Sequence, residues 1–109
     1  MMQVRGFAVS VLITIKIPGD TGAFRRAITE RADEFAKIGE GARSVGAIHH
    51  RLGLGDGYVL VVDEWESSEQ FERFFGSPSL QAFIHEVGGH TAAAPRVIVA
   101  EAIGSADQF

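Results

Sequence analysis

The sequence contains no cysteine, and this absence removes several classes of site. Disulfide frameworks, thiolate zinc sites, cysteine-ligated iron–sulfur clusters and cysteine nucleophiles all require that side chain. A reducing compartment is compatible with such a chain, and we expect a cytoplasmic protein. The first residues carry little positive charge, and the apolar stretch behind them ends at Lys16 without a small-residue cleavage site, so we expect no secretion signal.

Long apolar runs and an excess of positive charge are also lacking. The longest apolar run is far shorter than the roughly 20 residues that a membrane-spanning helix needs, so we expect no membrane partner. The formal net charge is −4 and the pI is near 5.5. Because this charge provides no general attraction to phosphate backbones, we also expect no nucleic-acid partner.

Tryptophan and tyrosine occur once each, whereas eight phenylalanines and a hydrophobic content of 46% supply ample apolar side chains. We expect the 109 residues to form a single domain, with a core at about 7–103 and a tail or arm at 104–109. A domain this small buries only about two thirds of the surface of its unfolded chain. Self-association would therefore add useful burial.

Four segments have the pattern of strands, and they lie at 9–17, 45–52, 58–65 and 96–103. In the first, odd-numbered apolar residues share one face. The second and third are separated by a glycine-rich segment at 53–57, whose Asp56-Gly57 pair predicts a hairpin turn. This glycine spacing differs from that of a nucleotide-binding loop, and a strand follows where such a loop needs a helix.

The first helical region is predicted between the first two strands. Asp20 is placed to cap its start, and apolar residues recur at three- and four-residue steps from Phe24 to Ile38. Gly39 and Gly41 are expected to end it.

The second helical region is predicted between the last two strands. Ser67 and Gln70 have the spacing of a capping box at its start. Gly76-Ser77-Pro78 then interrupts the apolar stripe, and Pro78 is placed to restart a helix that ends at Gly88-Gly89. The resulting order, βαββαβ, predicts a ferredoxin-like α+β fold with an antiparallel four-stranded sheet and helices on one face.

Several predicted strands are apolar on both faces, although helices can cover only one face of a two-layer domain. The clearest cases are the segment 58–62 and the alternation of Val97 and Val99 with Ile98. One interpretation is a shallow exposed groove or simple β propensity. The favoured one is a homodimer in which two sheets close on each other and leave a partly apolar cavity in or beside the barrel.

Local motifs add a resemblance to this pattern. Asp63-Glu64-Trp65 ends the third strand, Ser67-Ser68-Glu69-Gln70-Phe71 opens the second helical region, and Ser77-Pro78 is followed by Leu80 and Phe83. Over roughly 7–103 the chain resembles the dimeric α+β barrel superfamily, and within it the antibiotic biosynthesis monooxygenase-like domains. The resemblance implies a homodimer that binds a small apolar or aromatic molecule, and a cofactor-independent monooxygenase acting on quinol or polyketide-type substrates.

A haem-degrading branch of that family provides an alternative. It resembles this chain at Trp65, but it needs an Asn on the first strand and a His about ten residues after the Trp, where this chain has Phe75. His85 lies about three turns further on. We therefore expect no cofactor and keep haem binding as a minority hypothesis.

His49 and His50 are the catalytic candidates. As neighbours on one strand they must face opposite sides of the sheet, so only one can line a given cavity. A histidine there can deprotonate a phenol or hydroquinone and make it electron-rich enough to react with O₂. Asp63 or Glu64 is placed to hold the tautomer of such a histidine. The alternative for each histidine is a structural or solvent-exposed role.

The substrate-binding candidates are Trp65, Tyr58, Phe75, Phe83, Arg51 and His85. Trp65 can offer an aromatic wall to a planar ligand, or simply anchor the sheet to the second helical region. No metal site is expected, because His85 and His90 lack the i, i+4 spacing that puts two histidines on one helical face. The alternative to an enzyme is a non-catalytic homodimer that binds a ligand or a partner protein.

Overall fold

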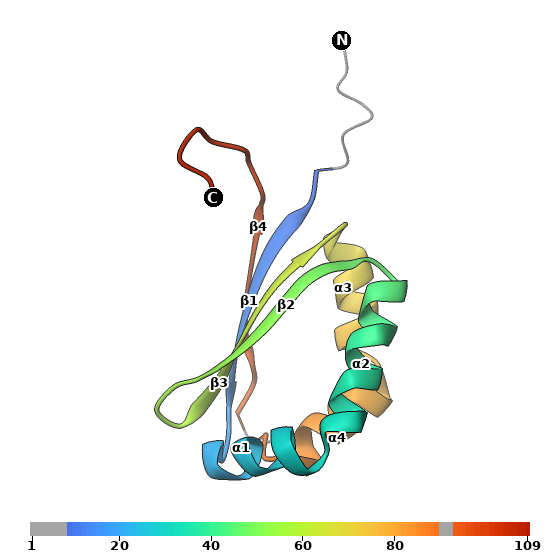
Figure 1. The fold of residues 1–109 in the computed structure, drawn as a ribbon, viewed down its shortest axis with the longest axis vertical. Coiled ribbons are helices and arrows are strands. Elements are labelled where there is room, and N and C mark those ends of the chain that lie inside the picture. Colours follow the sequence, from blue (N-terminus) through green and yellow to red (C-terminus); the bar gives the residue numbers. More distant parts are fainter. Residues whose placement is uncertain (1–8, 90–92) are drawn as a thin grey trace.

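A computed structural model describes residues 9–89 and 93–109. The elements are, in chain order, β1 (Val11–Pro18), α1 (Thr21–Glu30), α2 (Ala32–Ser44), β2 (Ala47–Leu54), β3 (Tyr58–Trp65), α3 (Ser68–Phe75), α4 (Pro78–Glu86) and β4 (Arg96–Glu101). The strands form an antiparallel sheet in the order β2-β3-β1-β4. The helices cover one face of this sheet (Figure 1), which confirms the predicted ferredoxin-like α+β fold.

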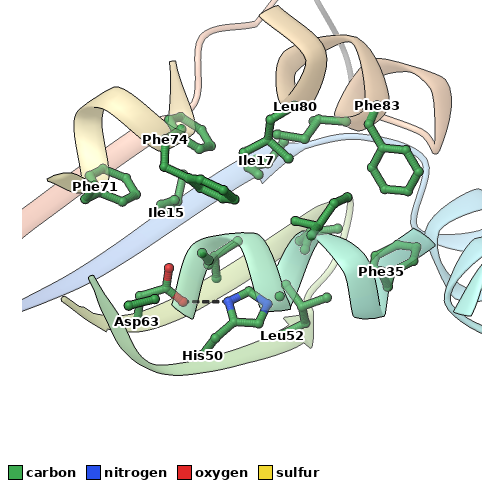
Figure 2. A pocket seen from close by; sticks show the side chains of 18 of the residues that line it. Ile15, Ile17, Phe35, His50, Leu52, Asp63, Phe71, Phe74, Leu80 and Phe83 are labelled. Atoms are coloured by element: carbon green, nitrogen blue, oxygen red, sulfur yellow. Dashed lines mark hydrogen bonds and ion pairs between the residues drawn. The ribbon is translucent and has the colours of Figure 1, made fainter. Parts of the chain in front are cut away.

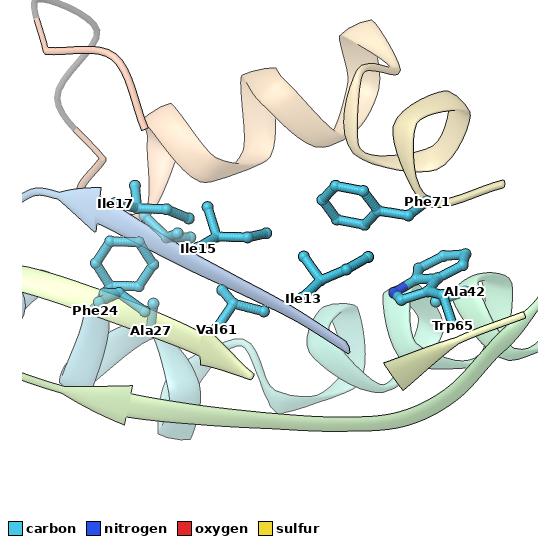
Figure 3. Packing of buried hydrophobic residues seen from close by; sticks show 11 residues of the cluster. Ile13, Ile15, Ile17, Phe24, Ala27, Ala42, Val61, Trp65 and Phe71 are labelled. Carbon is cyan, nitrogen blue, oxygen red and sulfur yellow. The ribbon is translucent and has the colours of Figure 1, made fainter. Parts of the chain in front are cut away.

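Strand alternation determines where the core lies. Ile13, Ile15 and Ile17 on β1 are at most 5% exposed, because odd-numbered residues of this strand face the helices. In the paired strand β3, Val59 and Trp65 are equally buried. These side chains pack against aromatic and small residues of the helices in a continuous layer (Figure 3).

The predicted start of the second helical region is confirmed. The Ser67 hydroxyl accepts a hydrogen bond from the backbone N–H of Gln70, which satisfies a donor that the first helical turn leaves free. Pro78 occupies the first turn of α4, as its missing N–H favours. Asp20 likewise caps α1 through the N–H of Ala23.

The first helical region differs from the prediction in two ways. It consists of two helices, because the backbone leaves helical geometry at Arg31, with φ −119° and ψ 34°. Gly39 and Gly41 lie inside α2, which ends at Ser44. A single helical glycine costs only about 1 kcal/mol, and Gly41 faces Phe74, which a Cβ there would meet at 3.7 Å. A Cβ at Gly41 would therefore make only an ordinary van der Waals contact.

The predicted strand ends also shift. The second strand begins at Ala47, since α2 and its cap at Val45 use the residues before it, and ends at Leu54. The fourth strand ends at Glu101 rather than Ile103. The side chain of Phe109, in the segment after β4, is fully exposed. His90 lies outside the described residues.

The second face of the sheet carries exposed apolar side chains. Leu12, Val62 and Ile98 are 48%, 43% and 55% exposed, and no helix lies on this side in Figure 1. We call this surface the outer face. Val97 and Val99 point to the helix side yet also remain exposed, because the helices pack mainly over the other three strands.

In the described part of the chain, no helix has the length and apolar character needed to cross a membrane.

A glycine cluster joins the end of β1 to the end of α4. The N–H of Asp20 donates to the carbonyl oxygen of Gly88, at 2.9 Å. Gly88 has φ +131°, and a Cβ there would lie 2.9 Å from the carbonyl oxygen of Asp20. Such a conformation and such an approach both favour a residue without a side chain.

We predict that Gly88→Ala lowers the free energy of unfolding by roughly 1–3 kcal/mol, through backbone strain and the close contact. Urea denaturation followed by circular dichroism measures the change. Gly39→Ala is the matched control, because a Cβ at that helical position meets nothing within 4 Å and should raise stability by about 0.5–1 kcal/mol. Equal effects of the two substitutions would contradict the role of Gly88.

Candidate functional site

A pocket of about 120 Å³ lies between the helix side of the sheet and the helices. Its lining is almost wholly apolar and includes Trp65 and six phenylalanines, which are Phe24, Phe35, Phe71, Phe74, Phe75 and Phe83. His50 and Asp63 are the two titratable side chains in it (Figure 2). The sequence had led us to expect an enclosed space formed with a second copy. This pocket lies within one chain, and the space between two copies stays a prediction.

A bulge in β2 brings His50 to this pocket. Ala47 pairs with Trp65, but His49 already pairs with Glu64, so the register shifts between Ala47 and His49. An extra residue in one strand reverses the order of faces. Ala47 and His50 therefore both line the pocket, although regular alternation would place residues 47 and 50 on opposite faces.

His50 and Asp63 form a close pair. The imidazole Nδ1 lies 2.7 Å from Asp63 Oδ1, since the two residues pair directly across β2 and β3. The Asp63 side chain is 7% exposed, whereas that of His50 is 49% exposed. His50 thus connects a buried carboxylate with solvent at the edge of the pocket.

The second carboxylate oxygen of Asp63 accepts a hydrogen bond from the indole of Trp65. The indole Nε1–H donates to Asp63 Oδ2 at 3.0 Å, and the ring packs against Phe71 and Phe74 at centroid distances of 5.8 and 5.6 Å. Trp65 is 1% exposed. Its N–H is therefore already bonded, and it serves the pocket as an apolar wall as well as anchoring the sheet.

These contacts select one tautomer of His50. An ionised carboxylate only accepts hydrogen bonds, so the hydrogen of a neutral His50 must lie on Nδ1. Among residues 9–89 and 93–109 no hydrogen-bond partner contacts Nε2, and this nitrogen lies on the side of the ring away from Asp63 (Figure 2). The pair has the arrangement of a base held by a carboxylate.

The structure brings together only some of the residues predicted from the sequence. Trp65, Phe75, Phe83 and His50 line the pocket. The other candidates lie elsewhere. His49, Arg51 and Tyr58 are on the outer face, where Tyr58 packs under Lys16 with the ammonium 4.4 Å from the ring centroid. His85 is exposed on α4, and its Nδ1 lies 3.3 Å from the Gly89 carbonyl oxygen.

The sequence reasoning did not select Phe35, Phe74 or Leu80 as pocket residues. Each belongs to an apolar helical stripe, which was assigned to the core. The signal that could have found them is an excess of large aromatic residues on the stripes, more than a small sheet needs to cover it. Phe35 and Phe83 meet edge to face, with ring centroids 5.2 Å apart.

Arg31 ties the helices together beside these two rings. Its guanidinium contacts Glu34 at 2.7 Å and Glu86 at 2.8 Å, and lies 4.9 Å from the Phe83 ring centroid. The hydrogen bond from Arg31 lowers the pKa of Glu34 below its ordinary value of 4.5. Glu34 foremost, with Glu86, raises the pKa of Arg31. Arg31 and Glu34 thus stabilise each other's charged form, and the contact with Glu86 links the break between α1 and α2 to the end of α4.

No group of three or more metal-ligating side chains occurs within residues 9–89 and 93–109. A lone imidazole beside a bonded carboxylate offers too few donors for a structural metal. The chemistry that the arrangement supports is proton transfer at Nε2 next to an apolar chamber.

Comparisons with known proteins reveal the fold. No family model matches the sequence, and no curated protein matches it significantly. A monooxygenase from the gene ActVA-Orf6 of Streptomyces coelicolor, solved with nanaomycin D, is 19% identical, with a TM-score of 0.61 over 94% of this chain and 95% of that one. SnoaB from Streptomyces nogalater, a cofactor-independent oxygenase, is 14% identical, with a TM-score of 0.60 over 93% of this chain and all of that one.

These likenesses show that the chain has the same α+β fold as the two solved structures. A dimeric ferredoxin-like protein from an uncultured marine organism also has it, at 10% identity and a TM-score of 0.58, over 93% of this chain and 94% of that one.

We predict that neutral His50 carries its hydrogen on Nδ1, and that Asp63→Asn moves it to Nε2. An asparagine that accepts from Trp65 through its oxygen must turn its NH₂ toward His50, so Nδ1 becomes the acceptor. Imidazole ¹⁵N chemical shifts distinguish the two tautomers. His49 provides an internal control, because it lies on the outer face away from Asp63. A wild-type His50 with its hydrogen on Nε2 would contradict the assigned pair.

Proposed function

We propose that this protein binds a small phenol or hydroquinone in the pocket and oxidises it with O₂, without a bound cofactor. The observation that carries the proposal is the His50–Asp63 pair, at 2.7 Å, on the rim of an otherwise apolar aromatic pocket. Two structural neighbours, a monooxygenase and a cofactor-independent oxygenase, support it.

His50 has the features of a general base for a bound phenol. Its Nε2 is free, and the Asp63 carboxylate stabilises the imidazolium that forms when the phenolic proton arrives. The side chain of His50 is half exposed, so the proton can pass on to solvent. The apolar lining keeps the phenolate poorly hydrated, which favours transfer of an electron from the ring to O₂.

The atoms and electrons of this reaction balance. After proton removal, the electron-rich ring reduces O₂ and a C–O bond forms at a ring carbon. The O–O bond then breaks, so that one oxygen atom stays on the ring and the other leaves as water. Hydroquinone plus O₂ thus gives hydroxyquinone plus water, and the substrate supplies all four electrons that O₂ accepts.

We predict that His50→Ala lowers kcat for hydroquinone oxidation at least about 100-fold, the usual contribution of a positioned base. An oxygen electrode measures O₂ consumption. His49→Ala is the matched control, because the neighbouring histidine faces the opposite side of the sheet and its loss should leave kcat within about twofold. Binding without O₂ consumption in the wild type would favour the non-catalytic binding protein, and equal losses in both variants would contradict a specific role for His50.

We propose further that the protein is a homodimer joined through the outer face. Leu12, Val62 and Ile98 leave an apolar surface in water there, and contiguous surfaces of this kind commonly mark interfaces. A second copy presents the same surface, so a two-fold axis would cover both. The dimeric ferredoxin-like neighbour supports this assembly.

We predict a mass near twice 11.7 kDa for the wild type and a monomer for Val62→Asp, since the partner sheet would bury the new charge. Sedimentation equilibrium over a range of concentrations measures this. Val45→Asp is the matched control, because Val45 is 45% exposed against 43% for Val62 but lies at the end of α2. A wild-type mass of one chain at every concentration would exclude the dimer.

A further inference from the structure

A second hollow, a groove on the protein surface, lies next to the pocket. A groove of about 340 Å³ runs along the surface where α2 meets α3 and α4. Ile38, Phe74, Leu80 and Phe83 line both this groove and the pocket. One layer of side chains therefore separates the two spaces.

The wall contains two aromatic and two aliphatic side chains. The Phe83 ring packs edge-on against Phe35 and lies under the guanidinium of Arg31. The Phe74 ring packs against Trp65. Leu80 is aliphatic, like Ile38, and it reaches into the pocket from α4 opposite the strand that carries His50 (Figure 2).

The volume of the pocket limits what it can hold. An apolar cavity of about 150 Å³ holds one benzene ring, and this pocket measures about 120 Å³. The pocket therefore has room for no more than one ring. A second fused ring would need the room now occupied by the wall side chains.

We propose that Leu80 is the residue that restricts the ligand to a single aromatic ring. The inference rests on the proposed function of the pocket and adds its substrate class, monocyclic phenols and hydroquinones. Truncation of Leu80 would join the pocket to the outer groove, because that side chain lines both. The joined space would then admit two fused rings while His50 and Asp63 stay in place.

Binding of hydroquinone and of 1,4-dihydroxynaphthalene, measured without O₂ by titration calorimetry, tests this proposal. We expect the wild type to bind hydroquinone at least about tenfold more tightly than the two-ring compound. Leu80→Ala should improve the two-ring Kd about tenfold or more and leave the hydroquinone Kd equal or weaker. Leu54→Ala is the matched control, because Leu54 packs against the core and does not line the pocket.

The outcomes separate the two levels of the proposal. If neither compound binds the wild type, the proposed function itself fails. If hydroquinone binds but the two-ring compound binds equally well, or if Leu80→Ala leaves the ratio unchanged, the size limit is overturned and the proposed function stands. If Leu54→Ala shifts the ratio as much as Leu80→Ala, general loosening of the fold explains the change and the role of Leu80 is overturned.

Discussion

The site depends on the buried carboxylate of Asp63, which accepts hydrogen bonds from two N–H groups. Asp63 is the one buried charged side chain among residues 9–89 and 93–109, and an unpaired charge in that position would be very costly. Trp65 and His50 supply the donors from either side. The same two bonds orient an aromatic wall and a base, so the requirement to satisfy one anion organises the polar part of the pocket.

Most of the fold could be predicted from the sequence because its signals are local. Alternation on β1 grouped the odd-numbered apolar residues on one face, and Ser67 and Pro78 located the starts of α3 and α4. The errors arose where tertiary packing overrides local preference. Gly39 and Gly41 are typical of helix ends, but α2 continues through both to Ser44, and no local signal marks the break at Arg31.

The site was less predictable because it depends on register. A single extra residue in β2 sets which neighbours accompany His50, and the bulge leaves no clear mark in the sequence. The sequence could show that His49 and His50 face opposite ways, but not which one faces the helices. The same ambiguity applies to Tyr58 and Arg51, which lie on the outer face. Alternation separates neighbouring residues onto two faces but does not tell which face the helices cover.

The central position of β1 in the sheet affects folding during synthesis. The hairpin of β2 and β3 joins near neighbours, but β1 must pair with β3 on one side and with β4 on the other, so that Val11 lies opposite Glu101. During synthesis the first strand therefore leaves the ribosome long before its last partner exists. Closing so long a loop is slow relative to local pairing, and the nascent chain must keep an apolar strand edge from other chains until translation is complete.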